Sequence, residues 1–110
     1  MNNISVFRDL SGNICKMELK GHTCYAPEGS DIVCASISSA VFSALNGIEN
    51  IVGVKFGYEQ DDGYLLFVLP NEIESKKRQN INVLLESMLL FLKELQKQYP
   101  SNVQIAELEV

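Results

Sequence analysis

A histidine and a cysteine with the chemistry of a catalytic pair lie near one another in the chain. His22 is the only histidine, and Cys34 follows it after eleven intervening residues. A thiolate is a strong nucleophile, and an imidazole within hydrogen-bonding reach can take the thiol proton. These two residues therefore predict the nucleophile and the base of a cysteine hydrolase.

Cys34 is expected in the first turn of a helix that follows a loop. Asp31 or Ser30 can cap this helix, because both side chains accept hydrogen bonds from free N–H groups at a helix start. The unpaired N–H groups and the positive end of the helix dipole favour a thiolate there. The N–H groups near Cys34 and Ala35 could also hold a developing oxyanion.

Each of these residues also has a simpler interpretation. Cys34 is within reach of apolar helix positions and could be a small buried hydrophobe. His22 could be an exposed loop residue without a task. Asp31 is favoured as a helix cap, and a second interpretation has it orient the ring of His22 as the third member of a triad.

Other residues are candidates for shaping the site. Ser38, one turn beyond Cys34, and Ala35 could line it, although a helix-surface role is open for the serine. Gly21 and Gly29 bracket the loop and could act as hinges. Ordinary turn formation explains the two glycines equally well.

The cysteines allow a second chemistry, in which Cys15, Cys24, Cys34 and His22 bind zinc. Structural zinc sites carry closely spaced cysteine pairs, which are absent from this sequence. An odd number of cysteines without close spacing also disfavours a disulfide framework. We therefore expect no metal, no cofactor and reduced thiols, as in a cytoplasmic protein.

Length and composition predict one globular domain over residues 1–110. Of these residues, 46% are apolar, and the formal net charge is −5. The acidic balance disfavours nucleic-acid binding, and the basic run 76–78 is interpreted as a solvated helix end. Residues 1–20 lack the pattern of a signal peptide, and the longest apolar runs, 65–69 and 88–92, are too short to span a membrane.

The hydrophobic pattern predicts pairs of strands alternating with single helices. The expected elements are strands 4–8 and 14–20, a loop over 22–30, a helix from Asp31 that stops at Asn46-Gly47, strands 52–58 and 64–69 around a turn at 61–63, a helix over 73–99 and a strand over 103–110. The unbroken apolar run 64–69 indicates a strand covered on both faces. In the last strand, Ala106, Leu108 and Val110 share a face. The order ββαββαβ predicts an α+β fold, a mixed or antiparallel sheet with two helices packed on it.

The helix over 73–99 carries a broad apolar stripe. Its members are Ile81, Leu84, Leu85, Met88, Phe91, Leu92, Leu95 and Tyr99, and it is widened by Val83 and Leu90, which lie a heptad apart. A stripe this broad can serve the core and a partner subunit together.

The residues around the candidate pair resemble a known family. Gly21-His22, then Gly29, Asp31-Ile32-Val33-Cys34-Ala35 and Ser38, resemble the ribosomal-processing cysteine protease family, Prp. The element order and the length of 110 residues also fit, so the resemblance covers the whole chain.

This resemblance implies a function and a site. Family members are bacterial cysteine endopeptidases that remove an N-terminal extension from a large-subunit ribosomal protein. They cleave after an aromatic residue in an apolar motif, and they are dimeric. The family nucleophile falls on Cys34 and the family histidine on His22, and the loop between them is thought to order when substrate enters.

The chain departs from the family pattern in this loop. Thr23 stands where alanine usually follows the histidine, and Cys24 and Pro27 also differ.

The expected partners are the tail of a ribosomal protein as substrate and a second copy of the chain, with no direct nucleic acid and no membrane. The alternatives are a non-enzymatic ribosome-assembly adaptor, with the stripe as its interface, and a redox or metal protein that uses the cysteines.

Overall fold

A computed structural model describes residues 1–27 and 29–110 of the chain. The elements, in order, are β1 (Asn2–Arg8), β2 (Ile14–Lys20), α1 (Ile32–Asn46), a π-helical segment (Gly47–Val52), β3 (Gly57–Asp61), β4 (Tyr64–Val68), α2 (Ser75–Gln98) and β5 (Val103–Glu109). The loop predicted over 22–30 lies between β2 and α1, and its residue Glu28 is outside the described residues. The predicted ββαββαβ order is confirmed.

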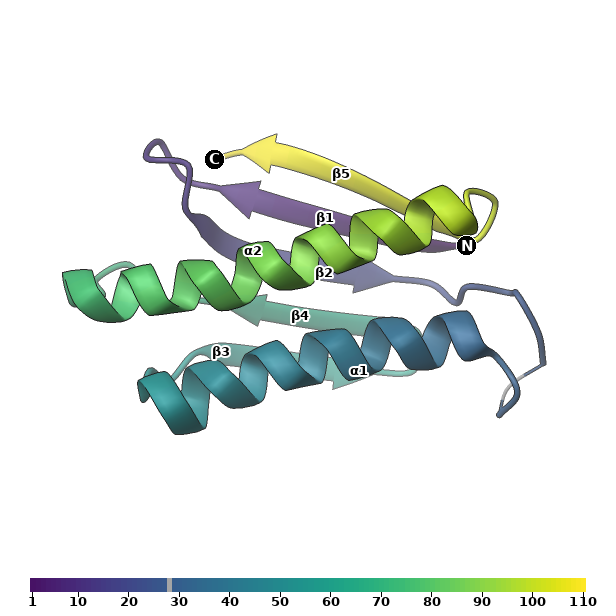
Figure 1. The fold of residues 1–110 in the computed structure, drawn as a ribbon, viewed down its shortest axis with the longest axis horizontal. Helices are drawn as coiled ribbons and strands as arrows, with labels where there is room; N and C mark the ends of the chain where they lie inside the picture. Colours follow the sequence, from purple (N-terminus) through teal and green to yellow (C-terminus); the bar gives the residue numbers. More distant parts are fainter. Residues whose placement is uncertain (28) are drawn as a thin grey trace.

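The sheet has five strands in the order β3-β4-β2-β1-β5. Neighbouring strands are antiparallel except β1 and β5, which are parallel. Both helices lie on the same face of the sheet (Figure 1), with α1 over the β3–β4 side and α2 over the β2–β1 side. The predicted mixed sheet with two packed helices is therefore confirmed, and its second face carries no helix from the described part of the chain.

The core lies between the sheet and the two helices. Strands β1, β2 and β4 bury Ile4, Val6, Met17, Leu19, Leu65 and Phe67, α1 buries Val33, Ile37, Val41, Ala44 and Leu45, and α2 buries Ile81, Leu85, Met88, Leu89, Leu92 and Leu95. The buried positions in each helix recur every three or four residues, which keeps one face on the sheet. Full burial of each leucine or isoleucine stabilises the fold by about 1.5–3 kcal/mol.

The one-sided layering corrects one expectation. Strand β4 was expected to be covered on both faces, but burial alternates along it: Leu65 and Phe67 are buried, whereas Val68 is 40% exposed. In β5, the face shared by Ala106 and Leu108 points to solvent. An unbroken apolar run was therefore a poor sign of burial on both faces, because the helices cover only one face of this sheet.

The end of α1 also differs from the prediction. The α-helix ends at Asn46, but a π-helical segment continues to Val52 and stops at Gly53, whose φ is +84°. Gly47 does not end the helical path, since its backbone is right-handed helical, with φ −62° and ψ −43°. It lies against α2, where a Cβ would be 3.0 Å from Leu84 Cδ1. Strand β3 consequently begins at Gly57 and not at Val52.

The helical stretch Ile32–Val52 is long and apolar enough to cross a membrane by length and composition, with a mean hydropathy of 1.4. Small polar residues interrupt this stretch, so that its unbroken apolar runs are short. In the fold, its apolar face packs on the sheet as part of the core. Core helices of this kind pass the same test.

Gly21 connects β2 to His22 and tolerates no side chain. Its φ is +91°, and a Cβ there would collide with the carbonyl oxygen of Met1. Its N–H also donates to the carbonyl of Gly63 at 2.8 Å. The backbone path into His22 is therefore set by a position that requires glycine.

We expect Gly21→Ala to lower the free energy of unfolding by about 3 kcal/mol, since it combines backbone strain with a collision against main chain. Gly12→Ala is the matched control: Gly12 also has a positive φ of +85°, but a Cβ at Gly12 would meet no atom within 4 Å. The control should lose only about 1 kcal/mol. Urea denaturation of both variants measures the difference, and equal losses would contradict the collision.

Candidate active site

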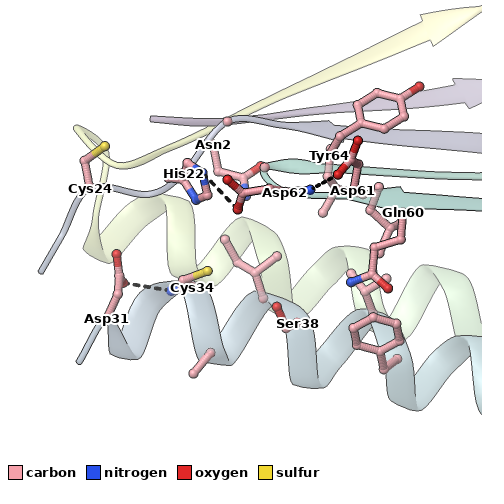
Figure 2. Close-up of a pocket in the computed structure, with 18 of the residues that line it drawn as sticks. Asn2, His22, Cys24, Asp31, Cys34, Ser38, Gln60, Asp61, Asp62 and Tyr64 are labelled. Atoms are coloured by element: carbon pink, nitrogen blue, oxygen red, sulfur yellow. Dashed lines mark hydrogen bonds and ion pairs between the residues drawn. The ribbon is translucent and has the colours of Figure 1, made fainter. Parts of the chain in front are cut away.

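His22 and Cys34 line one open cleft between the start of α1 and the end of the sheet. The cleft has a volume of about 970 Å³. Its walls include Asn2, Gly21, His22, Cys24, Gly29, Asp31, Cys34, Ala35, Ile37, Ser38, Val41, Phe42, Gln60, Asp61, Asp62, Gly63, Tyr64 and Leu65. Figure 2 shows His22 on the sheet side of this cleft and Cys34 on the helix side. The structure thus brings together every residue predicted for the site.

Cys34 lies in the first turn of α1, as predicted, but its thiol is not activated in this conformation. Burial raises the pKa of the Cys34 thiol, and the nearby negative charge of Asp31 raises it further, while the Ser38 hydroxyl has a smaller, lowering effect. The expectation that the helix start makes this thiol acidic is therefore wrong, because burial and Asp31 raise its pKa. Proton transfer to a base is needed before Cys34 can attack.

The two N–H groups expected to hold an oxyanion are already engaged. The Cys34 N–H donates to Asp31 Oδ1 at 2.9 Å, and the Ala35 N–H donates to the Asp31 carbonyl at 3.1 Å. Neither is free to bind an oxyanion in this conformation. The positive end of the α1 dipole still faces the thiol, because Cys34 is within the first helical turn.

His22 interacts with Asp62 and not with Cys34. Its Nε2 is 3.7 Å from Asp62 Oδ1, and both side chains are exposed. The ring also lies against Gly63, where a Cβ would be 3.0 Å from Nε2. Among the described residues, no hydrogen bond joins the imidazole to the Cys34 sulfur. For the proposed pair to act, the His22 ring would have to move from Asp62 toward the thiol.

Asp31 is the N-cap of α1, as favoured from the sequence. Besides the Cys34 N–H, it accepts hydrogen bonds at Oδ2 from the Thr23 hydroxyl and, at 3.1 Å, from the Tyr25 N–H. Burial alone would raise the pKa of this carboxyl, but the hydrogen bonds from Thr23, Cys34 and Tyr25 outweigh it and lower the pKa. The carboxylate is committed to the helix start and the loop, and the carboxylate that faces His22 is that of Asp62.

The other predicted site residues also lie at the cleft. Ser38 and Ala35 line its helix wall. Gly29 has a φ of +88° with open space around it, which is typical of a glycine turn. Gly21 is held by Gly63 on the sheet side. The hinge role of the two glycines stays a prediction.

Sequence reasoning missed the residues that the β3–β4 turn brings to the cleft. Asp62 and Gly63 were recognised only as turn formers. They reach His22 because β4 pairs with β2 in a register that sets Tyr64 opposite Lys20. Asn2 was also missed: it is 7% exposed, and its Oδ1 is buried without a hydrogen-bond partner in the described part of the chain. No local pattern signals such strand pairing.

The residues suggested for zinc are dispersed. Cys15 lies at the start of β2, half-buried, where its thiol is 3.3 Å from the Phe7 carbonyl. His22 follows the opposite end of the same strand. Within residues 1–27 and 29–110, no group of three His, Cys, Asp or Glu side chains is placed to hold a metal ion. All three cysteines are free thiols.

The chain is similar to known cysteine proteases, in agreement with a site that contains a histidine and a cysteine. The family profile described as "Cysteine protease Prp" matches residues 1–104. The ribosomal processing cysteine protease Prp of Bacillus subtilis (strain 168) is 28% identical over 103 residues, covering 92% of each chain.

Two solved structures of the essential ribosomal processing protease Prp from S. aureus have the same fold. The one in complex with a covalently linked product peptide has a TM-score of 0.87 and 21% identity, covering 97% of this chain and 99% of the other. The one in complex with a substrate peptide has a TM-score of 0.82 and 20% identity, with the same coverage.

We expect Asp31→Asn to make the Cys34 thiol more acidic. The substitution removes a negative charge that raises the thiol pKa, while asparagine remains a good helix cap. The pH profile of Cys34 alkylation by iodoacetamide, followed by peptide mass spectrometry, should therefore move to lower pH.

Asp9→Asn is the control for this experiment. Its carboxylate is held in the β1–β2 turn by the N–H groups of Ser11 and Asn13. This variant should leave the Cys34 profile in place. A shift to higher pH in Asp31→Asn would contradict the electrostatic role assigned to Asp31.

Proposed function

Because this chain belongs to the cysteine protease Prp family, we propose that it removes the N-terminal extension of a large-subunit ribosomal protein. We propose further that it cleaves this extension after an aromatic residue in an apolar motif. The observation that carries the proposal is the placement of the only histidine and a first-turn cysteine on opposite walls of one cleft. A ribosomal processing cysteine protease needs this pair and room for an extended peptide between its members.

The reaction begins with a proton transfer. His22 leaves Asp62, approaches the thiol and takes its proton, so that the Cys34 sulfur can attack the carbonyl carbon of the scissile peptide bond. The oxyanion forms next to the positive end of α1. His22 then donates its proton to the leaving amine as the carbon–nitrogen bond breaks, and water hydrolyses the thioester to restore the thiol.

The cleft offers apolar and acidic surfaces to a substrate. Ile37, Val41, Phe42 and Leu65 supply apolar side chains on the helix and sheet walls, as an apolar cleavage motif requires. The net charge of −5 favours encounter with a basic ribosomal-protein tail, an effect that salt screens. No cofactor enters this mechanism.

We also propose that the active species is a homodimer. The outer surface of the helix layer exposes apolar residues of α2: Val83 is 66%, Leu90 65% and Phe91 45% exposed. Phe91 faces the start of α1 across a groove that also contains Ile32, itself 57% exposed, and Ala35. A second copy of the chain would remove this apolar surface from water.

We place the reaction in the cytoplasm. The nucleophile is a free thiol, and two further free cysteines are present in the chain. A reducing compartment keeps such thiols from pairing.

The second candidate function is that of a non-enzymatic adaptor for ribosome assembly. The exposed apolar residues of α2 are the observation that favours it.

Cys34→Ala should abolish cleavage of a synthetic peptide that carries the ribosomal-protein extension, with a loss of about 10⁴-fold or more, as for other nucleophile deletions. Cys15→Ala, which alters a thiol at the far end of β2, should cleave at the wild-type rate. Mass spectrometry of the products under reducing conditions measures both. Wild-type protein that binds the peptide and leaves it whole would favour the adaptor.

Leu90→Glu should convert the dimer to monomers. A carboxylate at the centre of an apolar interface should raise the dissociation constant by about 100-fold, as expected for an interface residue worth about 3 kcal/mol. Leu10→Glu is the matched control, since Leu10 is 87% exposed in the β1–β2 turn and does not belong to the exposed apolar residues of α2. Light scattering after gel filtration measures the mass, and a monomeric wild type would contradict the proposed dimer.

A further inference from the structure

Thr23 is the residue directly after the candidate base, and it is fully buried. Its exposed fraction is 0%, and it is not among the residues that line the cleft. Thr23 therefore does not touch a substrate bound there. A buried hydroxyl needs a hydrogen-bond partner, and the partner here decides what the side chain does.

The Thr23 hydroxyl joins the two segments that carry the catalytic pair. It donates to Asp31 Oδ2, while the other oxygen of the same carboxylate accepts the Cys34 N–H at 2.9 Å. Thr23 belongs to the chain that leaves β2 with His22, and Asp31 belongs to the start of α1. One carboxylate thus links the residue next to the base with the backbone of the nucleophile.

The sheet holds the other side of Thr23. Its carbonyl accepts a hydrogen bond from Asn102 Nδ2 at 2.9 Å, and the carbonyl of Asn102 accepts the N–H of Asn2 at 2.9 Å. Asn2 begins β1, and Asn102 directly precedes β5. Thr23 is therefore held by the sheet at its main chain and by α1 at its side chain.

We propose that Thr23 is a positioning residue for proteolysis, whose hydroxyl keeps the His22 segment in register with Cys34. This inference rests on the proposed protease function. His22 must move from Asp62 to the thiol, and a fixed neighbour limits that movement to the side chain. Small losses of alignment between reacting groups reduce the rate of the chemical step strongly.

The buried location of Thr23 predicts which kinetic constant changes. Removal of the hydroxyl leaves the cleft surface intact, so substrate binding should be retained. The loss should appear in kcat, because alignment of the base and nucleophile is needed in the transition state. If Thr23 had only a structural role, its substitution would lower the fraction of folded protein. The activity of each variant would then fall in proportion to its loss of stability.

The test compares Thr23→Val, which keeps the branched shape, with Thr23→Ser, which keeps the hydroxyl. We expect Thr23→Val to lower kcat about tenfold with KM within about twofold, and Thr23→Ser to recover most of the rate. Asn82→Ala is the control for lost stability, since it removes a half-buried hydrogen bond to Asn13 at 2.9 Å from α2. It should lower the melting temperature and leave kcat unchanged.

Amide hydrogen exchange at Cys34 gives a readout that needs no activity. If the hydroxyl fixes Asp31, the Cys34 N–H should exchange faster by about tenfold in Thr23→Val and at the wild-type rate in Thr23→Ser. Unchanged kcat and unchanged exchange in folded Thr23→Val would overturn the proposal.

If Thr23→Val does not fold, Thr23→Ala serves as the variant without the hydroxyl. A kcat for Thr23→Ser as low as that of Thr23→Ala would then overturn the proposal. Wild-type protein that fails to cleave would defeat the protease function, and the exchange result would still decide whether Thr23 is coupled to Cys34.

Discussion

The carboxylate of Asp31 is the interaction on which the site depends. It caps α1 through the N–H of Cys34, and it holds the loop through Tyr25 and Thr23. These hydrogen bonds satisfy the negative charge well enough to lower its pKa despite burial. The arrangement fixes the position of the nucleophile, and the same charge disfavours the thiolate. Asp31 therefore positions Cys34 and contributes to the raised pKa of its thiol.

The geometry of the site separates His22 from Cys34. His22 lies on Gly63 beside Asp62, and the surroundings of Cys34 raise the pKa of its thiol. Movement of one exposed imidazole across the cleft would supply the missing proton acceptor. Such a design suits a cysteine protease, because a thiol that ionises only after substrate enters is protected from unwanted reactions.

Local signals in the sequence were sufficient for much of this structure. The alternation in Ile14–Lys20 gave both ends of β2, and Asp31 was recognised as a cap because its spacing to Cys34 suits one helical turn. Features that depend on distant contacts were not predictable in this way. Gly47 continues a helical path and lies against Leu84 of α2, and Asp62 reaches His22 through the pairing of β4 with β2. The Thr23 hydroxyl had no visible partner until the loop was folded.

The hydrogen bond between Asn102 and Thr23 has a consequence for the order of assembly. It joins residues that are 79 positions apart, and it forms only after all of α2 has been synthesised. Strand β1 likewise gains its parallel neighbour β5 last, and such long-range closure is slow relative to local folding. A nascent chain on the ribosome would therefore carry both His22 and Cys34 before it could hold the segment after His22 in place. The arrangement around Thr23 would therefore form only after Asn102 and β5 have been synthesised.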